Sequence, residues 1–342
     1  MLRFNPLFRY FAFGLLFFSS CTLDKTPPVM VVTPYEFDLP DGFPIPDIST
    51  EKTLSQERIA LGKMLFHDVR LSRDNTISCA SCHLQESAFA DHNPVSVGIE
   101  GRIGFRNSPT LVNVAYHPYF FKEGGNTSLE AQAFGPIEDH REMDFSTAGI
   151  ILKLQDDLEI QEMSYTAFGR AFDNFVIVNA LGSFQRTIIS ANSRYDDFFY
   201  KNNINALTNS EKRGLALFKS ERTQCQKCHG GFDFSEYAIV NNGTYANYED
   251  KGLARITQDG SDVGKFKVPT LRNIELTYPY MHNGGYPTLE SVIERYNLGG
   301  FNHPNQSEFI KPLNLTETEK MDLIAFLKSL TDWDLINNPA FK

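Results

Sequence analysis

A chain of 342 residues is long enough for two domains, each with a substantial core. Its net charge of −10 argues against a nucleic-acid partner, and its 29 phenylalanines and 14 tyrosines suit a protein that encloses flat apolar cofactors. Four of the five cysteines stand in two Cys-x-x-Cys-His words and the fifth is Cys21, so none remains for a disulfide.

The first 21 residues, MLRFNPLFRYFAFGLLFFSSC, are typical of a bacterial lipoprotein signal. Arg3 and Arg9 precede an apolar run that ends in small residues directly before Cys21. We expect export to the periplasmic side of the cell envelope, with Cys21 lipidated as the first residue of the mature chain. A plain secretory signal with an incidental cysteine is the alternative. The apolar run is too short to be a convincing membrane span, so contact with the membrane is predicted only through the lipid.

Residues 22–50 are rich in proline and aspartate and have no helical pattern, so we predict a tether with an extended entry into the first domain. Residues 51–203 and 204–342 are the two predicted domains. Each contains one of the Cys-x-x-Cys-His words.

The first word joins Cys79, Cys82 and His83, and the second joins Cys225, Cys228 and His229. Two cysteines at this spacing can form thioethers to the two vinyl groups of a haem, and the next histidine can then ligate the iron. A zinc cage of four thiolates is the first alternative, but it does not need a histidine after each pair. A redox-active cysteine pair is the second alternative, but it does not explain why the chain has two Cys-x-x-Cys-His words.

The segments before the two words resemble each other, because each contains a short amphipathic helix that ends in Leu-Phe. Ser55 and Ser210 are the predicted N-caps of these helices. Further helices are predicted over 128–134, 147–156, 164–191 with a break, 288–297 and 316–330, the last with a capping box. No run of alternating strands is visible. The predicted fold is mainly α, with two cytochrome c-like domains that have long loops and one c-type haem each.

With these motifs in hand, the chain resembles the bacterial di-haem cytochrome c peroxidases and their relative MauG. The resemblance extends from about residue 50 to about residue 332. It depends on both words and on RNSPTLVNVAY at 106–116, SLEAQAFGPIEDHREM at 128–143 and KVPTLRNIELTYPYMHNG at 267–284.

The resemblance implies that hydrogen peroxide reacts at the haem of the first word, beneath Gln132 and Glu142, with Pro136 shaping the pocket. Splitting an O–O bond needs a group that takes a proton from one oxygen and gives it to the other, and a carboxylate can do both. Glu142 is the predicted acid–base residue and Gln132 the residue that orients peroxide. A solvated surface charge is the alternative for Glu142, because charged residues surround it.

The haem of the second word is expected to handle electrons. Many family members have a methionine as the second iron ligand of this haem, and at that position this chain has Tyr296, as MauG does. Met281 is a rival ligand. The alternative is that Tyr296 is a tyrosine of the hydrophobic core and binds no iron. The resemblance also implies one Ca²⁺ between the haems, bound by the Asn107 side chain and by the carbonyls of Thr277 and Pro279.

Two departures from the family pattern stand out. Peroxidases of the family that need reductive activation have a histidine after a Ser-Ile-Gly, and this histidine closes the peroxide site. Here Ile99 follows Ser-Val-Gly instead. An open first site is therefore predicted, unless His92 takes the place of that histidine. Lys122 stands where the family has a tryptophan between the haems. Tyr119, Phe120 or Phe121 are weaker substitutes for that tryptophan.

The first hypothesis is therefore an exported cytochrome-c peroxidase that reduces hydrogen peroxide with electrons from a small c-type cytochrome or a cupredoxin. The second is a MauG-like enzyme that uses peroxide to oxidise residues of a partner protein. The third is an electron carrier without enzymatic activity. A homodimer fits the resemblance, but no interface is visible in the sequence.

Overall fold

The computed structural model describes residues 1–2, 32–49 and 52–342, and this part of the chain is mainly helical. The predicted lipoprotein signal from residue 3 onward, including Cys21, lies outside the described residues. None of the described helices is long and apolar enough to cross a membrane.

In the first half of the chain the α-helices are α1 (Gln56–His67), α2 (Cys79–Cys82), α3 (Leu129–Gln132), α4 (Phe134–Glu138), α5 (Thr147–Leu154), α6 (Leu158–Phe168) and α7 (Asn174–Gln185). In the second half they are α8 (Arg194–Phe199), α9 (Asn209–Phe218), α10 (Ala254–Thr257), α11 (Leu289–Asn297), α12 (Glu317–Lys328) and α13 (Trp333–Asn337). The only strands of the described chain are β1 (Ile239–Val240) and β2 (Phe266–Lys267), an antiparallel pair with Ile239 opposite Lys267 and Val240 opposite Phe266.

Short 3-10 turns connect these elements and leave long irregular loops between them. They are η2 (Val69–Leu71), η3 (Gln85–Ser87), η4 (Ile99–Gly101), η5 (Val114–Tyr116), η6 (Cys225–Lys227), η7 (Gly260–Asp262), η8 (Ile274–Leu276) and η9 (Pro339–Phe341). The prediction of a mainly helical chain with long loops is confirmed.

Capping decides where the helices before the two words begin. Ser55 caps α1 as predicted, since its side chain accepts a hydrogen bond from the Arg58 amide. The prediction of Ser210 is wrong, because Thr208 caps α9 and forms a capping box with Glu211. Ser210 lies inside α9 instead, and its hydroxyl donates to Asp322 on α12 at 2.5 Å.

The other predicted helices exist, with shifted ends. The segment 128–134 is divided into α3 and α4, and the predicted break in 164–191 separates α6 from α7 at Gly169, which has a left-handed conformation (φ 67°). Helix α6 starts earlier than predicted because Asp157 caps it. Thr316 and Glu319 form the predicted capping box at the start of α12.

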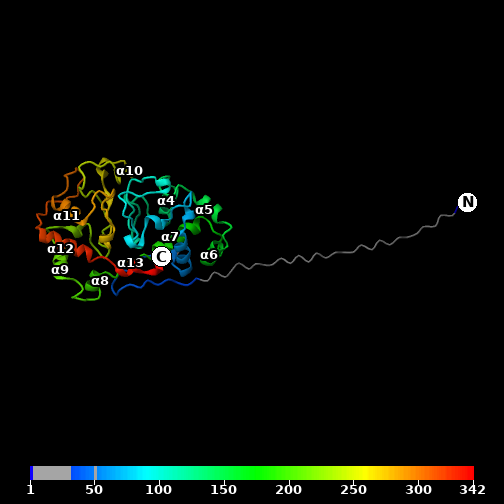
Figure 1. Cartoon of the computed structure of the whole chain (residues 1–342), viewed down its shortest axis with the longest axis horizontal. Coiled ribbons are helices and arrows are strands. Elements are labelled where there is room, and N and C mark those ends of the chain that lie inside the picture. The colour runs from blue at the N-terminus through cyan, green and yellow to red at the C-terminus, as the bar shows by residue number, and fades with distance from the viewer. Residues whose placement is uncertain (3–31, 50–51) are drawn as a thin grey trace.

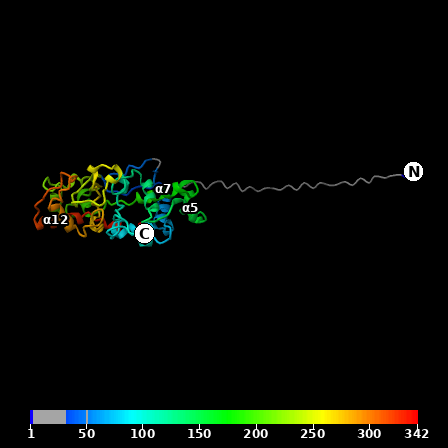
Figure 2. The same ribbon diagram turned by 90° about the horizontal axis from the view of Figure 1, so that it is seen from above.

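The described chain has two hydrophobic cores, which lie side by side in Figure 1 and in the turned view of Figure 2. The first core contains α1 packed on α7, and the second contains α9 packed on α12. The cores do not follow a single cut in the chain. Tyr195 of α8 belongs to the second core, whereas Leu335, Ile336 and Phe341 at the C-terminus return to the first. The boundary between residues 203 and 204 stays a prediction.

The same close approach occurs at both helix crossings. A Cβ added to Gly62 of α1 would lie 1.9 Å from the carbonyl oxygen of Ala180, and one added to Gly214 of α9 would lie 1.9 Å from that of Asp322. Each glycine stands four residues before the phenylalanine of its Leu-Phe pair. The repeat seen in the sequence therefore has a physical basis, which is a backbone contact that excludes any side chain.

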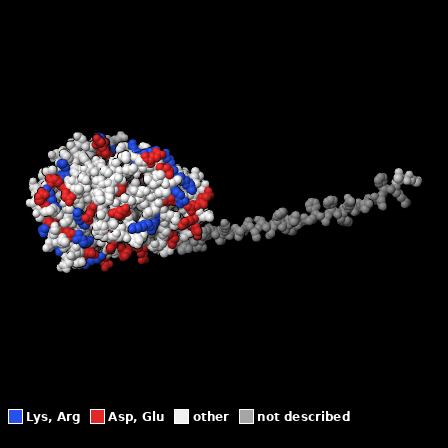
Figure 3. Space-filling model, in the orientation of Figure 1, with Lys and Arg blue, Asp and Glu red and all other residues white. Residues whose placement is uncertain are grey.

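The segment 32–49 runs along both halves of the molecule (Figure 1). Phe43 is buried, with its ring 5.3 Å from those of Tyr200 and Phe232 and 6.3 Å from that of Tyr116. On the face drawn in Figure 3, acidic and basic side chains are interspersed, and a broad area between them has no charged side chains.

Candidate active site

One cavity of about 750 Å³ is lined by both Cys-x-x-Cys-His words. Cys79, Cys82 and His83 border it from the first word, and Cys225, Cys228 and His229 border it from the second. Most of its other lining residues are apolar, as is usual for pockets that enclose large organic cofactors. The fold thus brings together two motifs that are more than a hundred residues apart.

The two histidines have equivalent hydrogen bonds. His83 Nδ1 lies 2.8 Å from the carbonyl oxygen of Phe89, and His229 Nδ1 lies 3.1 Å from that of Phe234. A carbonyl oxygen only accepts, so Nδ1 carries the proton in each ring and Nε2 keeps its lone pair for a metal. Burial lowers the pKa of His83 below its ordinary value and that of His229 to about 4, which keeps both rings neutral.

All four cysteines of the words are free in the described chain, and burial raises their pKa values. No group of three or more His, Cys, Asp or Glu side chains is placed to hold a metal ion among the described residues. The two words therefore do not form a four-cysteine cage in the described part of the chain, so the zinc alternative has no support from the geometry.

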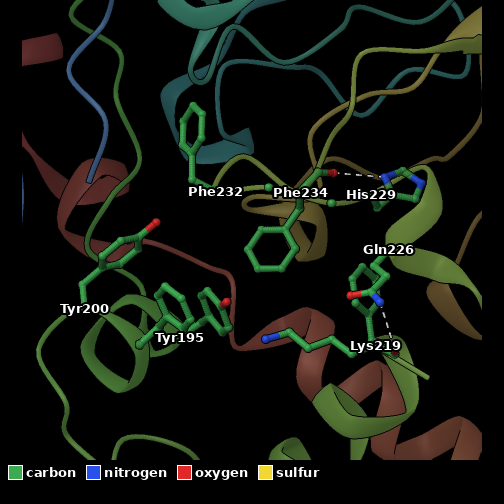
Figure 4. A pocket seen from close by; sticks show the side chains of 11 residues that line it. Tyr195, Tyr200, Lys219, Gln226, His229, Phe232 and Phe234 are labelled. Carbon is green, nitrogen blue, oxygen red and sulfur yellow. Dashed lines mark hydrogen bonds between the residues drawn. The ribbon is translucent and has the colours of Figure 1, made fainter. Parts of the chain in front are cut away.

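A smaller cavity of about 320 Å³ lies beside the second word (Figure 4). Tyr195, Tyr200, Phe232 and Phe234 line it together with His229, and Figure 4 shows the carbonyl of Phe234 directed at the histidine ring. Because this cavity touches only the second word, the larger cavity is the one that can hold both cofactors.

Gln132, Pro136 and Glu142 all line the larger cavity, as does the first word. Gln132 ends α3, Pro136 lies in α4, and Glu142 stands in the loop that follows α4. The side chains of Gln132 and Glu142 make no hydrogen bond within the described part of the chain, so both are free to bind a ligand. Burial, helped by Asp139, raises the pKa of Glu142 to about 7.

Gly98 fixes the position of the Glu142 backbone. A Cβ on Gly98 would lie 2.0 Å from the carbonyl oxygen of Arg141 and 2.6 Å from that of Glu142. The amide of Ile99 then donates to the Glu142 carbonyl at 3.0 Å. The loop that carries Glu142 is therefore packed against the segment after the first word. This contact has no signal in the sequence beyond the glycine itself.

Tyr296 of α11 and Met281 also line the larger cavity. The Asn242 side-chain amide nitrogen lies 3.2 Å from the Tyr296 hydroxyl and 3.3 Å from the Met281 sulfur. Its carbonyl oxygen accepts from the Thr244 hydroxyl, which fixes the orientation of the amide. Asn242 is thus a residue of the site that the sequence reasoning missed. Burial raises the pKa of Tyr296 above its ordinary value, so its phenol is neutral here.

Asn107, Thr277 and Pro279, the three predicted calcium ligands, line the same cavity. The Lys122 ammonium donates a hydrogen bond to the side-chain oxygen of Asn107, and the Asn107 amide nitrogen donates to the Pro279 carbonyl at 2.9 Å. A lysine and an asparagine therefore use two of the three oxygens on which the calcium prediction depends, those of Asn107 and Pro279.

A family model described as di-haem cytochrome c peroxidase matches residues 56–204. Cytochrome-c peroxidase IdrP1 of Pseudomonas sp. (strain SCT) is 33% identical to the chain, over 92% of the chain and 88% of the relative. The chain belongs to the di-haem cytochrome c peroxidase family.

The MauG branch of the di-haem cytochrome c peroxidase family is equally similar. The methylamine utilization protein MauG of Methylophilus methylotrophus is 32% identical, over 95% of the chain and 96% of the relative. A solved structure of a MauG-like protein associated with microbial copper homeostasis superposes with a TM-score of 0.86 at 35% identity, covering 90% of the chain and 99% of that protein. The family assignment and the class of enzyme, a cytochrome-c peroxidase, are confirmed.

Membership of the di-haem cytochrome c peroxidase family implies two c-type haems, and the residues of both words fit them. The cysteines and neutral histidines of each word border one cavity, and each histidine has its Nδ1 proton bound to a carbonyl. Cys79, Cys82, Cys225 and Cys228 would attach the haems covalently.

His92, the residue that could substitute for the missing histidine of the first site, does not line the larger cavity. Its ring stacks on Tyr278 at 4.1 Å, and its Nε2 lies 3.2 Å from the Leu276 carbonyl oxygen. Phe120 and Phe121 do line the cavity, whereas the Tyr119 hydroxyl donates to the Tyr237 carbonyl.

Proposed function

We propose that this chain is an exported di-haem peroxidase that reduces hydrogen peroxide to water at the first word. Each turnover consumes one peroxide, two protons and two electrons and releases two waters. The observation that carries the proposal is the Glu142 carboxyl group, which borders the same cavity as His83 and has its pKa raised to about 7 by burial.

In this proposal Glu142 moves the proton. Its carboxylate accepts a proton from one oxygen of the peroxide and returns it to the other, which leaves as water. Gln132 orients the peroxide through its side-chain amide, and Pro136 shapes the wall between them. Cys79, Cys82 and His83 would hold the haem of the first word, which would supply the redox-active iron.

We infer that the molecule consists of two cytochrome c-like units. Equivalent helix crossings at Gly62 and Gly214 and equivalent histidine hydrogen bonds support two related halves. The second unit would hold its haem through Cys225, Cys228 and His229 and pass electrons to the first. A small c-type cytochrome or a cupredoxin would supply them.

Tyr296 would ligate the iron of the C-terminal haem, with Met281 as its rival. A Tyr296→Phe variant is expected to change the ferric absorption and electron paramagnetic resonance spectra of that haem, because the axial ligand sets its electronic structure. Met281→Leu is the matched control, since both side chains approach Asn242, and it should leave the spectra unchanged. The reverse result would assign the ligand to Met281.

Export and anchoring belong to this proposal as well. The family is typically periplasmic, and the signal with a lipidated Cys21 would place the mature chain on that side of the membrane. Labelled fatty acid should enter the wild type and not a Cys21→Ser variant. A homodimer and the calcium ion stay predictions.

A MauG-like activity, in which peroxide oxidises residues of a partner protein, is the second candidate. Tyr296 and the likeness to a MauG-like structure favour it, and the loss of the tryptophan at Lys122 weighs against long-range oxidation. The deciding experiment mixes the haem-loaded protein with peroxide and a reduced small cytochrome c. Steady oxidation of the cytochrome supports the peroxidase. Peroxide reactivity without cytochrome turnover favours the MauG-like role, and no peroxide reactivity would leave only the electron carrier.

A further inference from the structure

The Lys122 side chain ends in the cavity wall at Asn107, next to the residues predicted to bind calcium. The contacts form a chain from one group to the next. The ammonium of Lys122 donates to Asn107 Oδ1, and Asn107 Nδ2 donates to the Pro279 carbonyl oxygen at 2.9 Å. Both oxygens are therefore already bound to N–H donors.

This arrangement does not fit Ca²⁺. Calcium takes six to eight oxygens that converge on one point. Here a cationic nitrogen stands at the Asn107 oxygen, and the asparagine turns its amide nitrogen, not its oxygen, toward Pro279.

Groups of both charges surround Lys122, with Asp91 and Asp250 the acidic ones. Of the two cations that face it, Arg106 is paired with Glu123 and with Asp250 at 2.6 Å, and Lys267 donates to the Tyr119 carbonyl at 3.2 Å. Asp91 is only 4% exposed, and within the described chain its Oδ1 has no hydrogen-bond partner. A buried carboxylate needs a nearby positive charge.

We propose that the Lys122 ammonium is the resident cation at Asn107 and Pro279 and replaces a calcium ion there. The position where the family has an inter-haem tryptophan would thus carry the site's positive charge. A side chain attached to the backbone does not dissociate, so the haem-loaded protein should keep its properties in the presence of a calcium chelator.

The test uses the haem-loaded protein and compares wild type with Lys122→Met and Lys267→Met. Lys267 is the matched control because it lines the same cavity, is half-buried like Lys122, and contacts His117 and Tyr119 instead of Asn107. Elemental analysis after gel filtration in EGTA should find much less than one calcium per two irons in wild type, and added Ca²⁺ should leave its absorption spectrum unchanged. Lys122→Met should bind Ca²⁺ at least about tenfold more tightly than Lys267→Met, because Asn107 Oδ1 is released.

Either of two results would overturn the proposal. One is a wild-type protein that retains one calcium per two irons, or whose haem spectrum changes when EGTA is added. This measurement stands even if a variant does not fold. The other is a Lys122→Met protein that folds, gains no calcium binding and melts at the same temperature as Lys267→Met. Because none of these readouts is turnover, they are independent of the peroxidase proposal.

Discussion

Replacing Glu142 with glutamine should slow the reaction of the haem-loaded ferric protein with hydrogen peroxide by about 10²–10⁴-fold. Glutamine has nearly the same shape, so the cavity beside the first word stays filled, but its amide cannot accept the peroxide proton. The measurement is the second-order rate constant from stopped-flow absorption at increasing peroxide concentration.

The same experiment has a predicted pH dependence. Burial and Asp139 raise the pKa of Glu142 to about 7. Below this pH the carboxyl is protonated and cannot act as a base, and above it the carboxylate can. The wild-type rate constant should therefore rise through about pH 7 and then level off, whereas the slow rate of Glu142→Gln should show no such step.

Glu138 offers the matched control. It ends α4, only four residues before Glu142, but its side chain is exposed and does not line the cavity. Glu138→Gln should keep the wild-type rate and the step near pH 7. A Glu142→Gln protein that reacts as fast as Glu138→Gln would remove Glu142 from the acid–base role.

Alanine at Gly214 or Gly62 should lower the free energy of unfolding by about 3 kcal/mol or more, at the upper end of the usual cost of overpacking. The added methyl carbon would lie 1.9 Å from a backbone carbonyl oxygen of the facing helix. Backbone does not move aside as a flexible side chain does, so the helices must separate. At α9, separation would also strain the hydrogen bonds of Ser210 and Arg213 to Asp322.

Thermal unfolding followed by circular dichroism measures this effect. For a chain of 342 residues a loss of this order corresponds to a melting temperature lower by about 4 °C. Gly260→Ala is the control, because Gly260 is exposed and an added Cβ there meets no atom within 4 Å. Equal melting temperatures for Gly214→Ala and Gly260→Ala would show that the α9–α12 crossing is looser than described.

Local chemistry in this chain could be predicted from the sequence. The two Cys-x-x-Cys-His words contain their cysteines and proximal histidine within five residues, so the spacing alone predicts covalent haem. The caps at Ser55 and Thr316 are equally local, because side chain and amide lie within one turn. Even here the prediction of Ser210 as the cap of α9 was wrong, since Glu211 completes a capping box with Thr208.

The tertiary structure alone decided what surrounds these local elements. In the sequence Glu142 stands among charged neighbours and has the pattern of a surface residue. It gains a raised pKa because the Gly98 segment and the cavity wall bury it. Lys122 reaches Asn107, and Asn242 reaches Tyr296 across 54 residues, through contacts that no periodic pattern encodes. Such contacts depend on how the loops close over the cavity, and the energy of that closure is distributed over both cores rather than carried by any short stretch of residues.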